Sequence, residues 1–279
     1  MKYFDVGRGE LIFLSSKPTP EFWDSHWAVE ETIKEKLYAV KDTFVSKMTQ
    51  NYLSPDDGMI LEGGCGWGQY LASLSRSGHI SIGVDFASKT LRVLKKYVPK
   101  LRLIIGDVRR LPFRDNSFAG YWSLGVIEHF EEGYTDIALE MSRVIREDGY
   151  LFVTFPYMSP LRKIKGWLGL YDTWVGEEEG NFHQFALNSD SVVEKFKGMG
   201  FELVKVVPHD AVSGIMHEIE VTRGLLQRML DYAPNHKWAG YVQTILNELV
   251  SNIAGHCVLL IFKKTDRRFG HKGRREEVI

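Results

Sequence analysis

The sequence predicts an α/β fold with a mostly parallel sheet that is covered by helices on both faces. The first observation is a strand, a glycine turn and a helix start in residues 59–70, MILEGGCGWGQY. The second is that short apolar segments alternate with amphipathic helical segments from residue 59 to about residue 207. Strands connected by helices run parallel and are buried on both faces. We therefore expect a ligand site beyond the carboxyl ends of these strands.

The composition indicates one domain with embellishments. The chain has 279 residues, 44% of them hydrophobic, and its formal net charge of -1 gives no overall attraction to nucleic acid or anionic membranes. Cys65 and Cys257 lie in separate elements and form no metal-ligand spacing, so we expect reduced thiols, no metal and a cytoplasmic location. The longest apolar run, residues 257–262, is far shorter than the ~20 residues that cross a bilayer. The apolar run 11–14 is too short for a signal peptide.

The N-terminal segment, residues 1–54, is expected to be irregular to about residue 20 and then helical to about Gln50. The helix prediction depends on apolar residues at helical spacing, namely Ile33, Leu37, Val40, Phe44 and Met48. Phe22, Trp23 and Trp27 precede this stripe, where they either pack in the core or cover a ligand. Residues 54–58, SPDDG, predict a turn.

Seven strands are expected in the main domain, residues 55–265. The predicted strands are 59–61, 79–85, 101–105, 118–123, 150–155, 201–207 and 257–263. The predicted helices run to about Ser77, from a cap at Ser88 to Tyr97, from about Tyr134 to Arg146, and from a cap at Ser189 or Asp190 to about Met199. Residues 157–186 and 209–255 are insertions, the second with two helical patterns, and residues 266–279 form a basic tail.

The glycine turn distinguishes between cofactors. A dinucleotide fingerprint needs G-x-G-x-x-G, but Gln69 occupies the third glycine position counted from Gly64. The pattern present is acid-x-Gly-x-Gly-x-Gly at Glu62, Gly64, Gly66 and Gly68, with Cys65 inside the turn. This pattern resembles the first motif of the class I S-adenosylmethionine-dependent methyltransferases. A glycine turn without any ligand is the simpler alternative.

Three later segments extend the resemblance. Asp85, followed by Phe86, matches the acidic strand end that binds the ribose hydroxyls in this family, although alone it would suit NAD equally well. Asp107 and Val108, in GDVRRLPF, match the segment that meets the adenine. Ser123 and Leu124, in SLGVIEHF, match the segment whose backbone carbonyl faces the methionine ammonium group. The resemblance implies a Rossmann-like sheet of strand order 3-2-1-4-5-7-6, with the seventh strand antiparallel.

The resemblance also implies transfer of a methyl group from S-adenosylmethionine, for which positioning and water exclusion supply much of the catalysis. A base is needed only for a hydroxyl or an activated carbon, and His129 and His183 are the candidates. Glu128 either acts as well or caps the helix that follows. The Glu-His pair is common in the subgroup that resembles quinone-biosynthesis enzymes. The N/D-P-P-Y/F motif of the nucleic-acid amino-methylating enzymes is absent from the sequence.

We therefore expect a methyltransferase that acts on a small-molecule or lipid-like acceptor and not on nucleic acid. A regulatory S-adenosylmethionine-binding protein and an NAD-dependent oxidoreductase remain as alternatives. The insertions 157–186 and 209–255, together with the N-terminal aromatic residues, are expected to cap a hydrophobic acceptor. The competing interpretation is that the helices of 209–255 form a homodimer interface.

Overall fold

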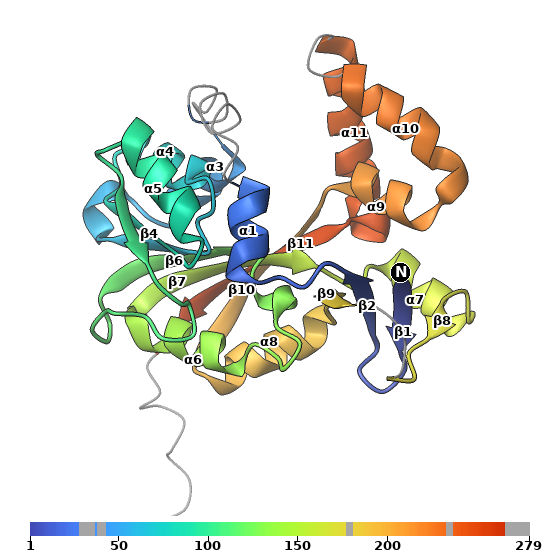
Figure 1. Ribbon diagram of the computed structural model, residues 1–279, viewed down its shortest axis with the longest axis horizontal. Coiled ribbons are helices and arrows are strands. Elements are labelled where there is room, and N and C mark those ends of the chain that lie inside the picture. Colours follow the sequence, from blue (N-terminus) through green and yellow to red (C-terminus); the bar gives the residue numbers. More distant parts are fainter. Residues whose placement is uncertain (28–36, 38–42, 177–180, 233–236, 266–279) are drawn as a thin grey trace, which may run out of the picture.

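A seven-stranded sheet forms the centre of the protein, as seen in a computed structural model that describes residues 1–27, 37, 43–176, 181–232 and 237–265 (Figure 1). The strand order is β5-β4-β3-β6-β7-β11-β10, in which β11 runs antiparallel to both of its neighbours. These strands are β3 (Ile60–Gly63), β4 (Ser81–Asp85), β5 (Arg102–Ile105), β6 (Phe118–Leu124), β7 (Ile145–Pro156), β10 (Phe201–His209) and β11 (Cys257–Lys264). Counted in predicted order, this is 3-2-1-4-5-7-6. The predicted fold and strand order are confirmed.

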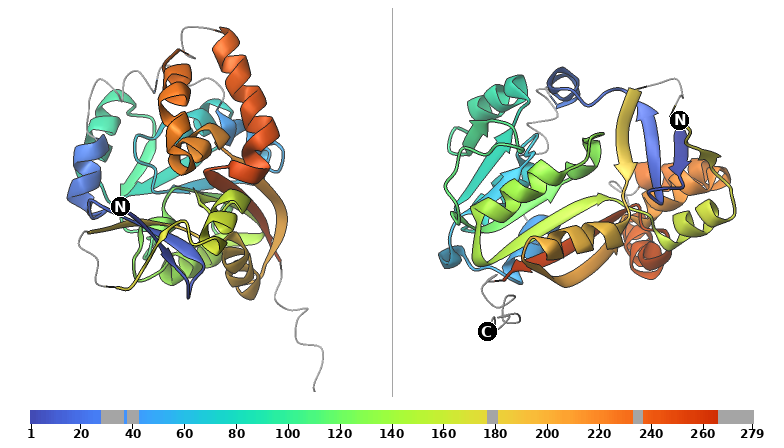
Figure 2. Two further views of the ribbon diagram at one scale, coloured as in Figure 1. Left: turned by 90° about the vertical axis from the view of Figure 1, so that its right-hand side faces the viewer. Right: turned by 90° about the horizontal axis from the view of Figure 1, so that it is seen from below.

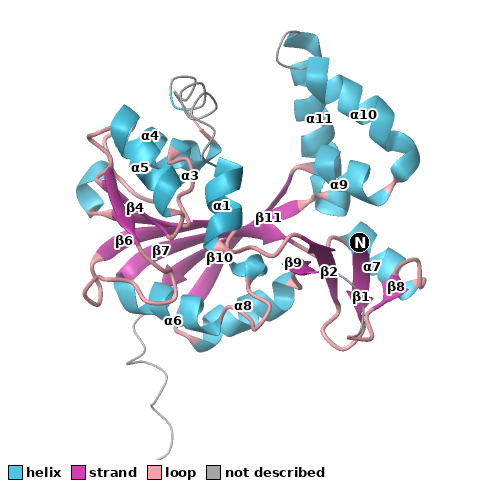
Figure 3. Cartoon of the chain, viewed as in Figure 1, coloured by secondary structure: helices cyan, strands magenta, loops and turns pink. Residues whose placement is uncertain are grey.

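Helices cover both faces of this sheet (Figures 1 and 3). One face carries α3 (Phe44–Gln50), α4 (Gln69–Arg76) and α5 (Ser88–Tyr97), and the other carries α6 (Thr135–Val144) and α8 (Ser189–Gly198). Short 3-10 helices, η1 (Pro55–Asp57) and η2 (Ile127–His129), precede β3 and follow β6. The strands are buried on both sides, so their residues read as near-continuous apolar runs, as in residues 151–155 of β7.

The predicted helix from Pro20 to Gln50 is wrong as one element. The structure has α1 (Pro20–Trp27) and a separate α3, while the predicted stripe residues Ile33 and Val40 lie outside the described residues. Thr43 has an extended backbone and forms a capping box with Ser46, so a new helix begins there.

A side chain of α1 caps α5. Asp24 Oδ1 accepts hydrogen bonds from the backbone N–H groups of Lys89 and Thr90, at 2.9 and 3.0 Å. The predicted Ser88 cap is therefore wrong, because the acceptor comes from a residue 65 positions away. This contact holds α1 against the main domain.

The first 20 residues are not irregular, contrary to prediction. They form a hairpin of β1 (Lys2–Asp5) and β2 (Glu10–Ser15), which joins β8 (Asp172–Thr173) and β9 (Asn181–Ala186) in a second sheet of order β8-β1-β2-β9. An isolated hairpin is marginally stable. Its pairing partner lies about 170 residues away in the chain, so local sequence patterns do not reveal it.

The insertion after β10 contains three helices instead of the two patterns that were predicted. These are α9 (Ala211–Glu218), α10 (Glu220–Tyr232) and α11 (Lys237–Ala254), which project from the main sheet beside the second sheet (Figures 1 and 2). The other insertion contains α7 (Pro160–Trp167), β8 and β9. Within the described part of the chain, no helix is long and apolar enough to span a membrane.

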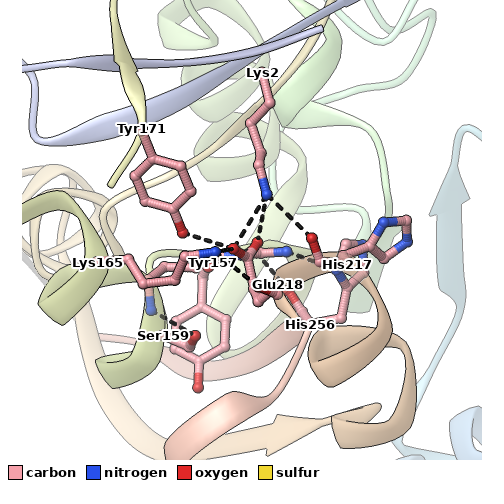
Figure 4. A network of polar contacts seen from close by, with 9 residues as sticks. Lys2, Tyr157, Ser159, Lys165, Tyr171, His217, Glu218 and His256 are labelled. Carbon is pink, nitrogen blue, oxygen red and sulfur yellow. Dashed lines mark hydrogen bonds and ion pairs between the residues drawn. The ribbon is translucent and has the colours of Figure 1, made fainter. Parts of the chain in front are cut away.

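A buried ion network joins the second sheet, α7 and α9 (Figure 4). The Glu218 carboxylate accepts hydrogen bonds from Arg162 Nε at 2.9 Å, Lys165 Nζ at 2.9 Å and the Tyr171 hydroxyl at 2.7 Å. Lys2 Nζ donates to both Glu218 carboxylate oxygens, at 3.1 and 3.2 Å. Three cations therefore share one carboxylate that is almost wholly removed from solvent. This network anchors the base of the projecting helices.

Candidate functional site

A pocket of about 550 Å³ opens at the carboxyl ends of the parallel strands. Its floor comes from the turn after β3 and from the segments that follow β4, β5 and β6, and α1 covers its mouth. The predicted site residues that line it are Gly64, Gly66, Asp85, Phe86, Asp107, Val108, Leu124 and His129. Four segments that are far apart in the sequence thus meet where parallel strands end, as expected for this sheet type.

The glycine turn forms a cradle that side chains would fill. Gly64 has φ +77°, and a Cβ atom built on it would lie 2.5 Å from Val126 Cγ2. Only glycine combines this conformation with such a close approach. Gly68 also has a positive φ, but it packs against Leu94 of α5 and does not line the pocket. Its function is therefore to bring α4 and α5 together.

Asp85, at the end of β4, is fixed by the glycine turn. Its Oδ2 accepts from Gly66 N–H at 2.8 Å and its Oδ1 from Ala87 N–H at 2.9 Å. Burial raises the pKa of the carboxyl, although the hydrogen bonds from Ala87, Gly66 and Phe86 oppose this effect. Each carboxylate oxygen keeps a free lone pair, which is what a vicinal diol requires as a double donor.

Asp107, after β5, is paired with Arg109 across the edge of the pocket. Arg109 Nε lies 3.0 Å and its terminal nitrogen 2.7 Å from Asp107 Oδ2. Burial favours the neutral acid, but the hydrogen bonds and charge of Arg109 outweigh it and lower the pKa of Asp107. Arg109 also contacts Glu132 at 3.3 Å and lies over the Phe130 ring at 5.3 Å. The guanidinium thus bridges the segments after β5 and β6.

His129, in η2, presents an imidazole to the pocket from a defined position. Its Nδ1 lies 2.9 Å from the backbone oxygen of His183, and the edge of the Trp23 ring system packs against it with centroids 5.0 Å apart. Because a carbonyl only accepts, Nδ1 carries the proton and Nε2 keeps a lone pair. Burial lowers the pKa of His129 to about 4, so the ring is neutral at pH 7.

His183 lies beside the pocket but does not line it. Its Nδ1 is 2.9 Å from the Ser16 backbone oxygen, and its ring packs on Phe22 and His129. The structure therefore brings the two candidate histidines together, with the His183 backbone holding the His129 ring. Glu128 points elsewhere: it is buried, its Oε2 has no hydrogen-bond partner, and burial raises its pKa to about 8.

Three further predicted residues lie beneath the pocket and not in its lining. Glu62, Cys65 and Ser123 are buried. Burial, and then the charge of Asp85, raises the pKa of Glu62 well above its ordinary value, and Glu62 Oε2 has no hydrogen-bond partner. An unsatisfied carboxylate oxygen behind a glycine cradle fits a ligand that carries a cationic group.

The cap over the pocket differs from the prediction. α1 supplies Trp23 and Trp27, and the insertion 157–186 supplies Phe182, but no residue of 209–255 lines the pocket. The second insertion therefore does not cap this site, because the helices α9–α11 extend away from α1 (Figure 1). The sequence analysis also did not select Lys17, Pro18, Arg109, Val126 and Phe130, which line the pocket. Arg109 and Phe130 lie inside recognised motifs, which was the available signal.

The pocket offers oxygen acceptors but no cluster suited to a metal. Among the described residues, no group of three or more His, Cys, Asp or Glu side chains is arranged to hold an ion. Acceptors for a diol and an amino group, a glycine cradle and a neutral imidazole are instead grouped around one cavity. This set suits a nucleoside-bearing ligand with a reactive end near His129.

Comparisons with known proteins agree with this geometry. The family model described as a methyltransferase domain matches residues 61–153. The chain is 27% identical to the demethylmenaquinone methyltransferase of Thermotoga maritima over 161 residues, which cover 52% of this chain and 70% of that protein. It is 34% identical to the Corynebacterium kroppenstedtii protein of the same name over 115 residues, 40% of this chain. The chain spans only 48% of the length of that relative.

Solved structures share the fold at low identity. A SAM-dependent methyltransferase from Methanosarcina mazei has a TM-score of 0.53 and 16% identity, covering 80% of this chain and 99% of that one. The [4+2]-cyclase SpnF has a TM-score of 0.55 and 15% identity, covering 90% of this chain and 98% of that one. Because one fold serves both a methyltransferase and a cyclase, these two likenesses establish the architecture alone.

The motif residues converge on one pocket, and the matched domain spans strands β3 to β7, which form that pocket. A pattern with Gln69 in place of the third glycine, a buried acid behind the turn and an acid after β5 favours S-adenosylmethionine over a nicotinamide dinucleotide. The chain is a member of the class I S-adenosylmethionine-dependent methyltransferases.

Proposed function

We propose that the protein methylates an apolar, ring-bearing small molecule with an ionisable hydroxyl group, and that His129 Nε2 accepts the hydroxyl proton. The observation that carries this proposal is the His129–His183 contact, because it leaves the Nε2 lone pair free beside the pocket. The names of the Thermotoga and Corynebacterium relatives, which specify demethylmenaquinone, support a quinol-like acceptor.

The lining near His129 suits such a ring. Trp23, Phe130, Phe182, Pro18 and Val126 form the apolar part of the pocket. Aromatic and aliphatic side chains of this kind contribute mainly by burying apolar area and by ring contacts. The pocket thus has an adenosine end, at Asp85 and Asp107, and an acceptor end, at His129.

S-adenosylmethionine, when bound, supplies a methyl group on a positively charged sulfonium. His129 takes up a proton as the acceptor gains the methyl group, and the electron pair of the broken carbon–sulfur bond stays on sulfur. The sulfonium charge is lost as the imidazolium charge forms, so the pocket keeps its total charge. This balance allows a histidine of low pKa to act as the base, and the His183 carbonyl stabilises the Nδ1–H that the imidazolium retains.

His129→Ala is expected to lower kcat by ~10²–10⁴, the range typical of general-base removal. Binding of S-adenosylhomocysteine should change less than twofold, since the imidazole contacts the acceptor end. The measurement is S-adenosylhomocysteine formation with a short-chain prenylated naphthoquinol under reducing conditions. Because the pKa of His129 is about 4, kcat/KM should stay level with respect to this group at neutral pH and fall as the pH drops through about 4.

His183→Ala is the matched control, because its backbone carbonyl holds His129 whichever side chain is present. We expect a loss of less than tenfold. Equal losses in the two variants would contradict the assignment of the base to His129. Tight binding of S-adenosylhomocysteine without turnover on any hydroxylated ring would favour the non-catalytic alternative.

Arg109→Ala is expected to weaken S-adenosylhomocysteine binding by three- to tenfold without lowering kcat. The reason is that Arg109 holds the Asp107 carboxylate in place by two charge-assisted hydrogen bonds, while each oxygen keeps room for another donor. Arg110→Ala is the control, since the neighbouring arginine does not line the pocket. Isothermal titration calorimetry measures both, and indistinguishable affinities would show that Asp107 needs no such restraint.

A further inference from the structure

Helix α7 is amphipathic in the reverse of the usual sense. Its charged residues Arg162 and Lys165 point inward, where both bind the Glu218 carboxylate (Figure 4). Gly166 packs against the Phe4 ring on the same inner side. A surface helix of a globular protein normally turns its apolar stripe inward and its charges outward.

The outer side of α7 is mostly apolar. Trp167 is 84% exposed, Leu168 55% and Ile164 52%, and Leu170 in the following turn is 61% exposed. The outward positions of the helix follow i, i+3, i+4, i+7 and i+8 spacing. We call this surface the α7 face, formed by Pro160, Lys163, Ile164, Trp167, Leu168 and Leu170.

The α7 face lies over an excess of positive charge. Lys2, Arg162 and Lys165 are opposed by the single carboxylate of Glu218. Of the two histidines beside them, His256 has its pKa lowered to about 3 by burial and by Arg162, and burial likewise lowers that of His217, so neither adds a compensating group. Residues 159–171 contain three cations and no acid.

We propose that the α7 face is a lipid-contact surface that seats the protein on an anionic bilayer. Exposed tryptophan and leucine side chains insert into the headgroup region, and the lysines at its border, Lys163, Lys165 and Lys2, face lipid phosphates. Nearby cations add to such binding because the surface potential of an anionic leaflet attracts them. This surface goes beyond the proposed methyl transfer, although it would place an apolar acceptor and its enzyme in the same phase.

A second copy of the chain fits this face less well. In a two-fold interface the same patch meets itself, so the positive excess of one copy would face that of the other. The ion network also holds α7 rigidly from the inside, so the helix cannot rotate to bury its apolar residues. A bilayer is apolar and negatively charged, which satisfies both properties of the face.

The test is flotation of the full chain with phosphatidylcholine vesicles, with and without 30% phosphatidylglycerol. We expect binding to the anionic vesicles, and at least a tenfold lower partition coefficient for the double variant Trp167→Ser, Leu168→Ser. Leu139→Ser is the matched control, because Leu139 is a 51% exposed leucine on α6 and lies outside the α7 face. Lys163→Glu should reduce binding to anionic vesicles and leave neutral vesicles unaffected.

Brominated lipids give an independent measurement. Trp167→Phe should remove most of the lipid-dependent fluorescence quenching, since Trp167 is the tryptophan of the α7 face. Thermal unfolding and S-adenosylhomocysteine affinity, measured without vesicles, should match the wild type in every variant. Wild-type protein that does not float, or a double variant that floats equally well, would overturn the proposal. So would sedimentation showing a wild-type dimer that becomes a monomer in the double variant.

Discussion

Replacing Glu218 with glutamine is expected to lower the free energy of unfolding by ~3–5 kcal/mol, the typical cost of removing one partner from a buried ion pair. The carboxylate is the only anion that Lys2, Arg162 and Lys165 share among the described residues of the network. Glutamine keeps the size of the side chain but leaves three cations facing a neutral amide. For a chain of this length the loss corresponds to ~10 °C or more in Tm, measurable by circular dichroism.

Glu194→Gln is the control for this prediction. Glu194 forms an exposed ion pair with Lys197 on α8, at 2.8 Å, and such pairs contribute ~0–1 kcal/mol. Similar effects of the two substitutions would mean that the network holds no more than a surface pair does.

The effect of Glu218→Gln should also depend on pH. Burial by itself would raise the pKa of Glu218, but the Tyr171 hydroxyl and the cations Arg162, Lys165 and Lys2 outweigh it and lower the pKa to about 2. A lowered pKa means that the ionised group adds stability above the unfolded value, near 4.5, and loses this contribution as the pH falls toward 2. The difference between wild type and variant should therefore be full at pH 7 and shrink below about pH 4.5.

Asp85→Ala is expected to weaken S-adenosylmethionine binding at least tenfold. The carboxylate offers paired acceptors at the end of β4, and hydrogen bonds to a charged group contribute ~1.5–3 kcal/mol each. The same oxygens accept from Gly66 and Ala87, so the substitution also loosens the turn that shapes the pocket. Both consequences lower affinity in a calorimetric titration.

Asp115→Ala separates this effect from a general loss of charge. Asp115 is exposed and pairs with Arg143 outside the pocket, so cofactor affinity should remain at the wild-type value. Unchanged affinity in Asp85→Ala would contradict the placement of the ribose at Asp85.

Much of the fold and of the cofactor end of the site could be predicted from local sequence. Glu62, the glycines, Asp85 and Asp107 belong to motifs of a few residues, and each motif stands at a strand end that apolar patterning reveals. Parallel strands bring those ends to one edge of the sheet, so the order of the motifs along the chain is enough to predict that they meet. Gly68 shows the limit of this inference, because the motif includes a glycine whose tight contact is with α5 and not with the pocket.

The tertiary structure alone decided the features that depend on distant partners. The hairpin of β1 and β2 has no strong local signal, since its stability comes from pairing with β9 across about 170 residues. Asp24 caps α5 from α1, and the His183 backbone selects the His129 tautomer, each through a contact across more than 50 residues.

The insertions show the same division most clearly. Helical periodicity in residues 209–255 was sufficient to predict helices, but periodicity gives no direction, and these helices project away from the pocket that they were expected to cap. The charges of α7 read as a solvated surface in the sequence, and yet they are buried because Glu218 lies opposite them in space. Sequence patterns determined which segments fold and which chemistry their ends carry, because those properties are local. The orientation of each segment was decided by the single partner that satisfies its buried charges and backbone groups.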